Sequence, residues 1–290
     1  MSHAGHNHPL NAAIWLTAAF MLVEFVGGYM ANSLALMADA GHMASDVLAL
    51  GIALAAQRIA MRPAHAGMTY GYGRVKVLAA QMNGLTLWFL CGWIVWEAIG
   101  RLQHPPQVQG SMVLIIASIG LVINLVIMRW LHGSHDLNTR AAYWHVLGDA
   151  LGSVAAIIAG AVIMLTGWMP IDPILSFFVA VVLAWGGWRL LRETTLELME
   201  ASPRHIDLDN VQQQMLQTKG VIGVHHIHIW RLPNSSYAAS AHVQVESMQD
   251  WSNVSQRLHD VFKAFEIEHV TLQPELDACD ENDMYCSNIK

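Results

Sequence analysis

Long apolar runs separated by short polar stretches occupy the first two thirds of the chain. A helix needs roughly 20 apolar residues to cross about 30 Å of hydrocarbon. Six segments of the chain qualify: 11–31, 34–59, 75–100, 112–131, 139–166 and 173–191. The pattern therefore predicts an α-helical polytopic membrane protein whose six-helix transmembrane domain covers residues 10–193.

Beyond residue 192 the apolar runs end, and residues 202–276 have the pattern of a small soluble domain. The stretches 224–230 (VHHIHIW) and 240–246 (SAHVQVE) alternate between apolar and polar residues, which is typical of half-buried strands. The stretch 269–275 (HVTLQPE) predicts a further strand.

Two amphipathic helices are predicted in the same part of the chain. Residues 207–217 (DLDNVQQQMLQ) and 250–265 (DWSNVSQRLHDVFKAF) have the helical period, and Asp250 or Ser252 caps the second helix. The order helix, strand, strand, helix, strand predicts a compact α+β domain, ferredoxin-like or metallochaperone-like, with its helices over one face of a small sheet.

Both ends of the chain are short and polar. Residues 1–9 form a histidine-containing N-terminus, and residues 277–290 form an acidic tail that we expect to be loosely ordered. No basic stretch precedes an apolar one at the N-terminus, so we expect no cleavable signal peptide.

Composition supports a membrane protein. Of the 290 residues, 54% are apolar and only 13% are charged, and the mean hydropathy is +0.36. The formal charge of -7 argues against nucleic acid as a partner, and three cysteines are too few for a disulfide framework. Sixteen histidines outnumber the fifteen Lys and Arg residues together, which favours metal binding.

Basic residues are distributed unequally over the loops between the predicted spans. With six spans, both termini share one side of the membrane with the second-to-third and fourth-to-fifth loops. That side carries these basic residues, against Arg101 alone on the other: Arg58, Arg62, Arg74, Lys76, Arg129, Arg140, Arg189 and Arg192. The positive-inside rule therefore predicts a multi-pass protein with both termini in the cytoplasm.

Ionisable residues interrupt two of the predicted spans. In the stretch ADAGHMASDV, the residues Asp39, His42 and Asp46 stand at i, i+3 and i+7, which share one face of a helix. The fifth span carries HVLGD, with His145 and Asp149 at i and i+4. An Asp at the centre of a span costs about 2.5 to 3.5 kcal/mol on insertion scales, so such residues normally face the protein interior or a transport pathway.

Two imidazoles and two carboxylates from two helices can surround one divalent cation. The four candidate ligands are His42, Asp46, His145 and Asp149, and they offer the nitrogen and oxygen atoms that Zn²⁺ prefers in tetrahedral sites. The alternative is structural hydrogen bonding between helices. Four roles remain open for Asp39. It holds a metal ligand in position, lies on a proton path, lies at the outer mouth of the site, or has a structural role.

Other polar residues in the spans have a simpler explanation. Glu24, Gln81, Asn83 and Asn124 either line an access route to the site or form hydrogen bonds between helices. We favour the hydrogen bonds for each of them.

Several long motifs occur in the same order as in a known family. They are SLALMADAGHMASDVLAL (33–50), TYGYGRVKVLAAQMNG (69–84), GLVINL around Asn124, LNTRAAYWHVLGDALGSVAAI (137–157), DPILS (172–176), LMEASP (198–203), VHHIHIW (224–230) and HVTLQPE (269–275). On these motifs the chain resembles the cation diffusion facilitator family, and specifically its zinc-transporting bacterial branch.

The resemblance implies a secondary active transporter rather than an enzyme, a homodimer in the bacterial inner membrane with no obligatory partner protein. Family members export cytoplasmic Zn²⁺ in exchange for protons and alternate between inward-facing and outward-facing states. The resemblance also implies that His42, Asp46, His145 and Asp149 form the transport site of each protomer. Relatives that move manganese or iron tend to carry Asp where His42 stands, so this sequence favours Zn²⁺, with Cd²⁺ as a second substrate.

Proton coupling can be argued from the ligands. An imidazole binds metal only when neutral, and its unperturbed pKa is about 6.5, so protons and Zn²⁺ compete for the same nitrogens. We expect zinc to load from a near-neutral cytoplasm with release of protons. A more acidic exterior would return the protons and expel the metal.

Histidines are also frequent in the soluble domain. Along 224–230, alternation places His226 and His228 on one face of the sheet and His225 on the other. The resemblance implies a regulatory Zn²⁺ site at the dimer interface of this domain. Its positions are His225, His242 and Glu275, with His259 as a weaker candidate. Zinc bound there should tighten the dimer, and the alternative is surface histidines without metal.

The two ends of the chain offer further zinc ligands. Cys279 and Cys286 lie in the tail, and His3, His6 and His8 lie at the N-terminus. Thiolates in a reducing cytoplasm are good zinc ligands, so these residues could form a capture site that delivers Zn²⁺ to the transporter. The alternative is two exposed thiols and a histidine-rich end without metal.

Two further predictions concern the cytoplasmic surface of the membrane. The resemblance places Arg74 against Glu200 as a charge interlock at the hinge of the dimer; the alternative is two solvated charges worth about 0 to 1 kcal/mol. Some family members bind an extra ion through Asp and His residues before a YGHG motif. Here only His65 remains in the matching segment HAGMTYGYG, so no such ion site is expected.

Three other functions fit parts of the pattern. His42 and His145 could clamp a haem, although the neighbouring carboxylates disfavour an apolar haem environment. An intramembrane metalloenzyme would need a general base beside the metal, and the sequence offers neither an HExxH motif nor a spare base. A zinc sensor that does not transport would use the same ligands.

Overall fold

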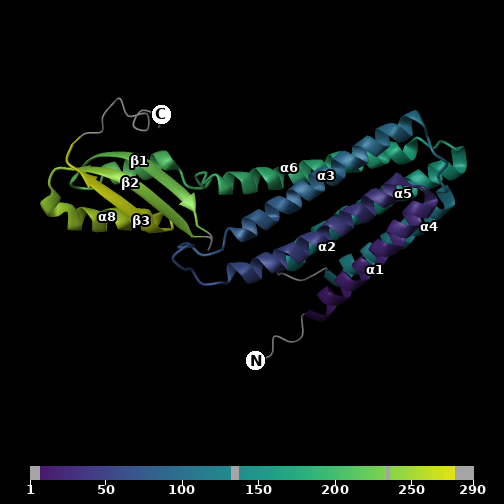
Figure 1. Ribbon diagram of the computed structural model, residues 1–290, viewed down its shortest axis with the longest axis horizontal. Helices are drawn as coiled ribbons and strands as arrows, with labels where there is room; N and C mark the ends of the chain where they lie inside the picture. Colours follow the sequence, from purple (N-terminus) through teal and green to yellow (C-terminus); the bar gives the residue numbers. More distant parts are fainter. Residues whose placement is uncertain (1–6, 132–136, 233–235, 278–290) are drawn as a thin grey trace. The chain divides into compact units, whose positions relative to one another are not determined.

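The computed structural model describes residues 7–131, 137–232 and 236–277, except for the side chains of 7–15, 131 and 137–145. Six long helices form the first part of the chain (Figure 1): α1 Asn7–Ala31, α2 Leu34–Ala60, α3 Val75–Gln103, α4 Gly110–Leu131, α5 Leu137–Thr166 and α6 Ile171–Leu198. Helices α2 to α6 are long and apolar enough to cross a membrane, and the described apolar part of α1, Leu16–Ala31, is shorter. The predicted polytopic helical fold is confirmed.

Proline and glycine residues stand where the helices end. Pro63 follows α2, Pro105 and Pro106 separate α3 from α4, and Gly167 follows α5. Gly167 has a φ of 69°, a left-handed conformation in which glycine avoids the steric cost that a side chain would bring. The chain therefore turns at the positions that its apolar pattern leaves between spans.

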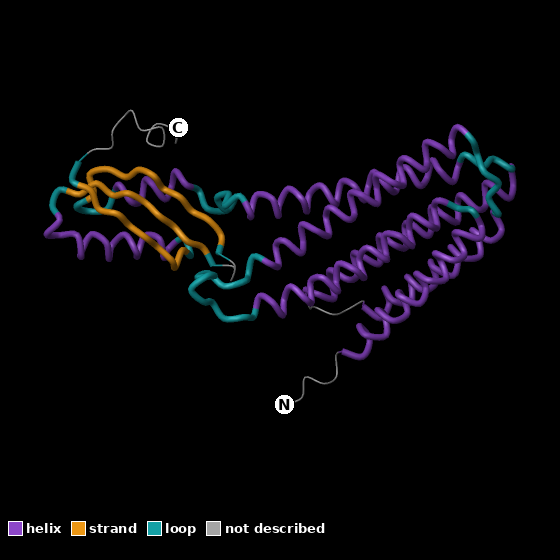
Figure 2. The backbone as a smooth tube through the Cα atoms, in the orientation of Figure 1, coloured by secondary structure: helices purple, strands orange, loops and turns teal. Residues whose placement is uncertain are grey.

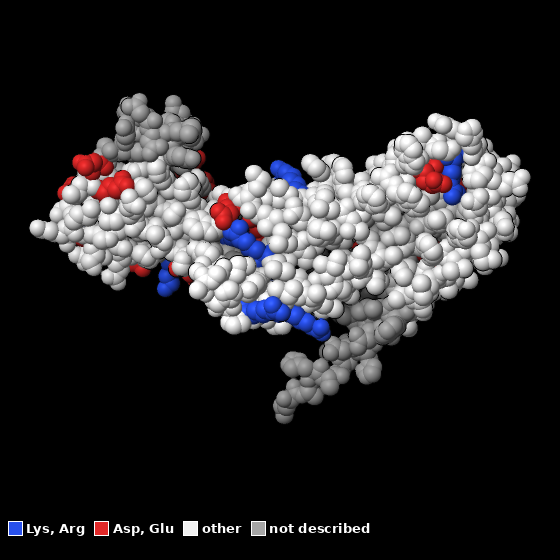
Figure 3. Space-filling view, viewed as in Figure 1, with Lys and Arg blue, Asp and Glu red and all other residues white. Residues whose placement is uncertain are grey.

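The outer surface of the helices is apolar. Large side chains such as Phe89, Trp96 and Trp185 are exposed. Over the helices, the face seen in Figure 3 carries few charged side chains. A contiguous surface of this kind is unfavourable in water and is suited to lipid chains. The helical part is therefore a multi-span membrane domain.

Packing divides the chain into two compact units. The first contains residues 1–54 and 79–191, and the second contains residues 55–78 and 192–290. The segment between α2 and α3 thus belongs to the same unit as the C-terminal part of the chain.

The second unit contains a three-stranded sheet (Figure 2). Its elements are α7 Leu208–Leu216, β1 Val221–Arg231, β2 Tyr237–Val245, the 3-10 turn η1 Met248–Asp250, α8 Trp251–Ala264 and β3 Ile267–Glu275. The strand order is β1-β2-β3, with β1 antiparallel and β3 parallel to β2. The predicted order of helices and strands is confirmed.

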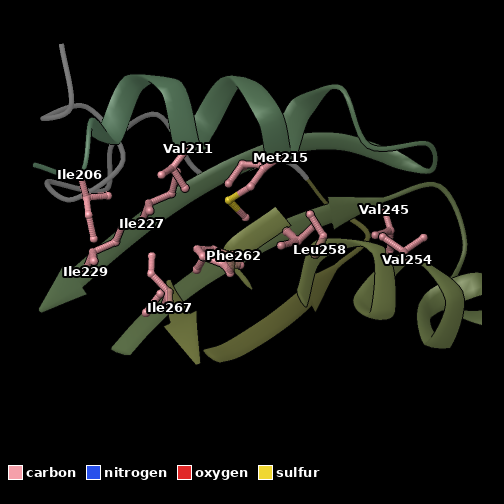
Figure 4. Close-up of a cluster of buried hydrophobic side chains, with 14 residues drawn as sticks. Ile206, Val211, Met215, Ile227, Ile229, Val245, Val254, Leu258, Phe262 and Ile267 are labelled. Carbon is pink, nitrogen blue, oxygen red and sulfur yellow. The ribbon is translucent and has the colours of Figure 1, made fainter. Parts of the chain in front are cut away.

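One buried apolar cluster joins both helices to the sheet (Figure 4). Met215 of α7 and Phe262 of α8 belong to the same cluster as Ile227 and Ile229 of β1. Both helices therefore cover the same face of the sheet, as predicted. The opposite face is left for the polar residues that alternate with the buried ones.

The N-terminus of α8 differs in detail from the prediction. Asp250 occupies the cap position, but its side chain makes no capping hydrogen bond, and Ser252 lies inside the helix. The Ser247 hydroxyl instead accepts a hydrogen bond from the Gln249 N–H and caps the preceding turn η1. The turn η1 therefore leads directly into α8, and the capping side chain stands before η1 rather than at the start of α8.

Candidate metal centres

The polar face of α2 is formed as the helical spacing predicts. Asp39 is buried, while His42 and Asp46 are partly exposed. The His42 Nε2 atom lies 3.5 Å from Asp46 Oδ2, one helical turn away. An imidazole and a carboxylate thus stand side by side on one helix, as adjacent metal ligands do.

Helix α5 contributes Asp149, which is buried. One turn further on, a Cβ built on Gly152 would lie 3.3 Å from Asp39 Oδ1, so α5 approaches α2 closely at this glycine. Asp149 lies near enough to Asp39 for their charges to interact. The backbone of His145 belongs to α5, but its side chain lies outside the described residues.

Glu24 of α1 is a residue whose environment the sequence analysis did not anticipate. It is fully buried, and neither of its carboxyl oxygens has a hydrogen-bond partner with good geometry among the described residues. The charges that act on it are those of Asp39 and Asp149. The hydrogen-bonding role favoured for Glu24 stays a prediction, with the Asp39 side chain of α2 as the partner that supports it. Asn124 of α4 does bond to Ser153 of α5, with Nδ2 3.4 Å from Oγ.

Helix α2 is held at its N-terminus by Asp172 of α6, which the sequence analysis did not single out. The Asp172 carboxylate accepts hydrogen bonds from Ser33 Oγ at 2.5 Å, Leu34 N at 2.7 Å and Ala35 N at 3.4 Å. Asp172 is fully buried. It satisfies N–H groups that have no partner within the helix and places a negative charge at the positive end of the helix dipole. The signal in the sequence was an acidic residue before a proline at the start of a span.

A second candidate centre lies in the α+β domain, on three neighbouring strands. Glu275 of β3 has its Oε2 atom 3.0 Å from His225 Nε2 of β1 and its Oε1 atom 2.7 Å from His242 Nδ1 of β2. One ligand atom from each of these residues lies within 4.8 Å of the others. Two imidazoles and one carboxylate suit Zn²⁺, because this ion takes nitrogen and oxygen ligands at about 2.0 to 2.2 Å.

The protonation of His225 also suits metal binding. Burial lowers the pKa of its imidazole below the ordinary value, the Glu275 carboxylate opposes this shift, and His226 and His242 reinforce it. A lowered pKa keeps the ring neutral at the pH of the cytoplasm, with a nitrogen lone pair available to a metal. Metal binding there is therefore expected to weaken as the pH falls towards that pKa.

Simple alternation is wrong for His225, which it places on the face of the sheet opposite His226. The pairing of β1 with β2 shifts register between His225 and His228, and His226 has a φ of 51°. The His226 ring therefore lies beside both His225 and His242, with ring centres 5.1 Å and 4.7 Å away. A β-bulge places two consecutive residues on the same side, which a period of two cannot predict.

One further predicted ligand among the described residues is not brought to these centres. His259 is outside the His225 group, and its Nδ1 atom lies 2.7 Å from the Ser255 carbonyl oxygen of its own helix. The predicted capture site lies outside the described side chains; its residues are His3, His6, His8, Cys279 and Cys286.

His65 has a structural environment. Its Nδ1 atom accepts a hydrogen bond from the Gly67 N–H at 3.1 Å, and its Nε2 atom lies 2.8 Å from the Tyr72 hydroxyl oxygen. Both ring nitrogens are thus used within the segment that joins α2 to α3. The expectation that His65 does not bind an extra ion stays a prediction.

Arg74 and Glu200 form an ion pair inside the second unit. Arg74 NH2 lies 2.7 Å from Glu200 Oε1, and both side chains are more than one third exposed. Glu200 has a φ of 58°, a left-handed conformation that costs an L-residue about 1 to 2 kcal/mol. The role of this pair as a charge interlock stays a prediction.

A charge swap tests the interlock. Because the pair is exposed, we expect Arg74→Glu to lower the free energy of unfolding by about 0 to 1 kcal/mol, and the double variant with Glu200→Arg to restore it. Thermal unfolding and zinc uptake of the two single variants and the double variant measure the effect. A double variant no better than Arg74→Glu alone would contradict the interlock.

Two family models match successive parts of this chain. The model of the cation efflux transmembrane domain matches residues 10–199, and the model of the cation efflux protein cytoplasmic domain matches residues 203–277. The chain belongs to the cation efflux family. The resemblance stated from the motifs is thereby confirmed, and family membership favours transport over the haem-binding and enzymatic alternatives.

Relatives of this cation efflux protein match it over nearly their whole length. Zinc transporter ZitB of Pectobacterium atrosepticum is 41% identical over 292 residues, which is 99% of this chain and 90% of the relative. The metal cation efflux system protein CzcD of Cupriavidus metallidurans is 39% identical over 96% of this chain and 91% of its own length. The cadmium, cobalt and zinc/H(+)-K(+) antiporter of Bacillus subtilis is 36% identical over 94% and 93%.

Proposed function

We propose that this cation efflux protein exports Zn²⁺ from the cytoplasm across the bacterial inner membrane in exchange for protons, as a homodimer with alternating access. The transport site of each protomer consists of His42, Asp46, His145 and Asp149, and Cd²⁺ is a second substrate. The names of the relatives support this choice of ions, since they include zinc, cadmium and protons.

The observation that carries the proposal is a group of buried acids in the helical unit. Glu24, Asp39 and Asp149 come from α1, α2 and α5, and their charges act on one another. Buried carboxylates are costly unless a cation or protons compensate their charge. His42 and Asp46 lie on the same face of α2 as Asp39, so the compensating ion meets a nitrogen ligand as well as oxygen ligands.

The presence of histidine favours zinc over harder cations. Mg²⁺, Ca²⁺ and Mn²⁺ prefer oxygen ligands, whereas imidazole suits Zn²⁺. A metal ion and a proton compete for the same imidazole nitrogen, so the transport site binds either metal or protons. Exchange of Zn²⁺ for protons follows from this competition.

The cytoplasmic domain is proposed to regulate the dimer. His225, His242 and Glu275 bind Zn²⁺ when cytoplasmic zinc is high, and the bound metal tightens the association of two protomers. The family of this domain supports a dimer. The distribution of basic residues supports a cytoplasmic location for this domain and for both termini.

Zinc uptake into liposomes tests the transport proposal. The full-length protein should concentrate Zn²⁺ inside vesicles, and an interior about one pH unit more acidic should raise accumulation about tenfold for each proton exchanged. His42→Ala should remove this uptake because it deletes a nitrogen ligand. His104→Ala is the matched control, since His104 is exposed and lies outside the proposed site.

The same measurement separates the remaining alternatives. A zinc sensor would bind the metal without moving it into the vesicles. Uptake that does not respond to the pH gradient would reject proton exchange, and unchanged uptake by His42→Ala would reject the site.

A further inference from the structure

His226 has a backbone conformation that is unusual for a residue in a strand. Its φ of 51° lies in the left-handed region, which side chains other than glycine rarely adopt and which is strained for an L-residue. Such strain persists only where the surrounding structure enforces it, and it is concentrated at functional sites. The conformation occurs at the bulge where the register of β1 against β2 shifts, next to His225.

The consequence of this bulge is a triangle of three imidazole rings. The ring centres of His225 and His226 are 5.1 Å apart, those of His225 and His242 are 5.2 Å apart, and those of His226 and His242 are 4.7 Å apart. Three imidazoles bound to one Zn²⁺ have ring centres about 5 Å apart, because the Zn–N bond is about 2.0 to 2.1 Å and the ligands diverge at the tetrahedral angle. The ring centres therefore have the spacing of a three-histidine zinc site, although the His226 nitrogens are not turned into the group that the other ligand atoms form.

The three ligands of the proposed regulatory site leave one tetrahedral position open. His225, His242 and Glu275 supply two nitrogens and one carboxylate. A structural zinc site is closed by four protein ligands, whereas an open position is typical of catalytic zinc. The His226 ring centre lies nearer to that of His242 than the His225 ring centre does. Its ring nitrogens lie outside the group formed by His225, His242 and Glu275, so a fourth bond requires the His226 side chain to move.

We propose that His226 is the fourth ligand of the cytoplasmic zinc site, a proposal that rests on the proposed binding of Zn²⁺ by His225, His242 and Glu275. The left-handed bulge brings the His226 imidazole to the same side of the sheet as the imidazoles of His225 and His242. The completed site has three nitrogens and one oxygen from all three strands of one protomer. Zinc then binds without a ligand from the cysteine tail or from a second protomer, and it fixes the bulge of β1.

Counting the imidazoles bound to zinc tests this assignment. The full-length chain carrying Asp149→Ala, which removes a ligand of the transport site, is loaded with one equivalent of Zn²⁺ and examined by X-ray absorption spectroscopy. We expect three imidazoles per zinc, and two when His226→Ala is added. Zinc affinity, measured against a chelating dye, should fall by more than about 100-fold, because loss of an outer partner of a ligand already costs roughly 10- to 100-fold.

His228→Ala is the matched control for these measurements. His228 lies on the same strand two residues away and is exposed. It takes no part in the ring triangle, so its removal should leave both the imidazole count and the affinity unchanged.

A glycine variant separates ligation from a purely structural role. Glycine adopts a φ of 51° without strain, so His226→Gly should keep or raise the melting temperature of the metal-free protein while zinc affinity falls. A structural role alone would change stability and leave affinity unchanged.

Four results would overturn the proposal. Two imidazoles in the presence of His226, or an affinity that His226→Ala and His226→Gly leave intact, would show that another group closes the site. A sulfur ligand would identify the cysteine tail as that group. If His225→Ala also leaves zinc binding unchanged, the proposed regulatory site is wrong, and the assignment of His226 is wrong with it. If His225→Ala loses zinc binding but the His226 variants keep it, only the assignment of His226 is rejected.

Discussion

Replacing Asp149 with alanine is expected to reduce zinc uptake into proteoliposomes by more than about 100-fold. Loss of an outer partner of a metal ligand already costs roughly 10- to 100-fold in affinity or activity, so loss of a ligand itself should cost more. Asp149 is buried on α5 and its charge acts on Asp39 and Glu24. Its removal leaves too little negative charge to offset the desolvation of a divalent ion.

The control for Asp149→Ala is Asn124→Ala. Asn124 is also buried and polar, and it bonds to Ser153 on the same helix as Asp149. Loss of a hydrogen bond between membrane helices costs only about 0.6 kcal/mol on average, so uptake should change little. Equal uptake by Asp149→Ala and the unaltered protein would remove Asp149 from the transport site.

The second large effect is expected from Asp172→Ala. This change leaves the Ser33 hydroxyl and the first N–H groups of α2 buried without their acceptor. Loss of a helix cap costs about 0.5 to 2 kcal/mol and each unsatisfied buried donor about 1 to 3 kcal/mol, so we expect a loss of about 3 to 5 kcal/mol in stability. Thermal unfolding in detergent should show a melting temperature lower by several degrees, together with reduced zinc uptake, because α2 carries His42 and Asp46.

Asp250→Ala is the matched control for the loss of this cap. Asp250 occupies the cap position of α8 but makes no capping hydrogen bond, so its replacement should cost little. Asp172→Asn keeps an acceptor oxygen, so its stability should lie between the stabilities of Asp172→Ala and Asp250→Ala. A melting temperature of Asp172→Ala equal to that of the unaltered protein would show that the contact of Asp172 with α2 does not stabilise this helix.

The two variants should respond differently to zinc. Ligand binding raises the apparent stability of the folded state, so Zn²⁺ should still protect Asp172→Ala against heat, whereas it should not protect Asp149→Ala. A His225→Ala background removes the cytoplasmic contribution from this comparison. Equal protection of both variants would show that Asp149 acts on helix position rather than on the metal.

The sequence by itself determined the elements and their order. Apolar length and period are local properties, and so the helices from α2 to α6 and the strands of the α+β domain follow from them directly. The pairing of His42 with Asp46 is equally local, because residues four apart are neighbours on any helix. The family also follows from motifs that are continuous in the chain.

The tertiary structure alone decided which residues distant in sequence meet. Asp172 lies 139 residues from Ser33, and no helical or strand period relates an acid on one span to the N-terminus of another. The burial of Glu24 beside Asp39 depends on how α1 packs against its neighbours. The bulge at His226 depends on a register shift between two strands, and a single inserted position reverses every later assignment of faces. Periodicity is a property of one element, whereas these contacts are properties of packing between elements.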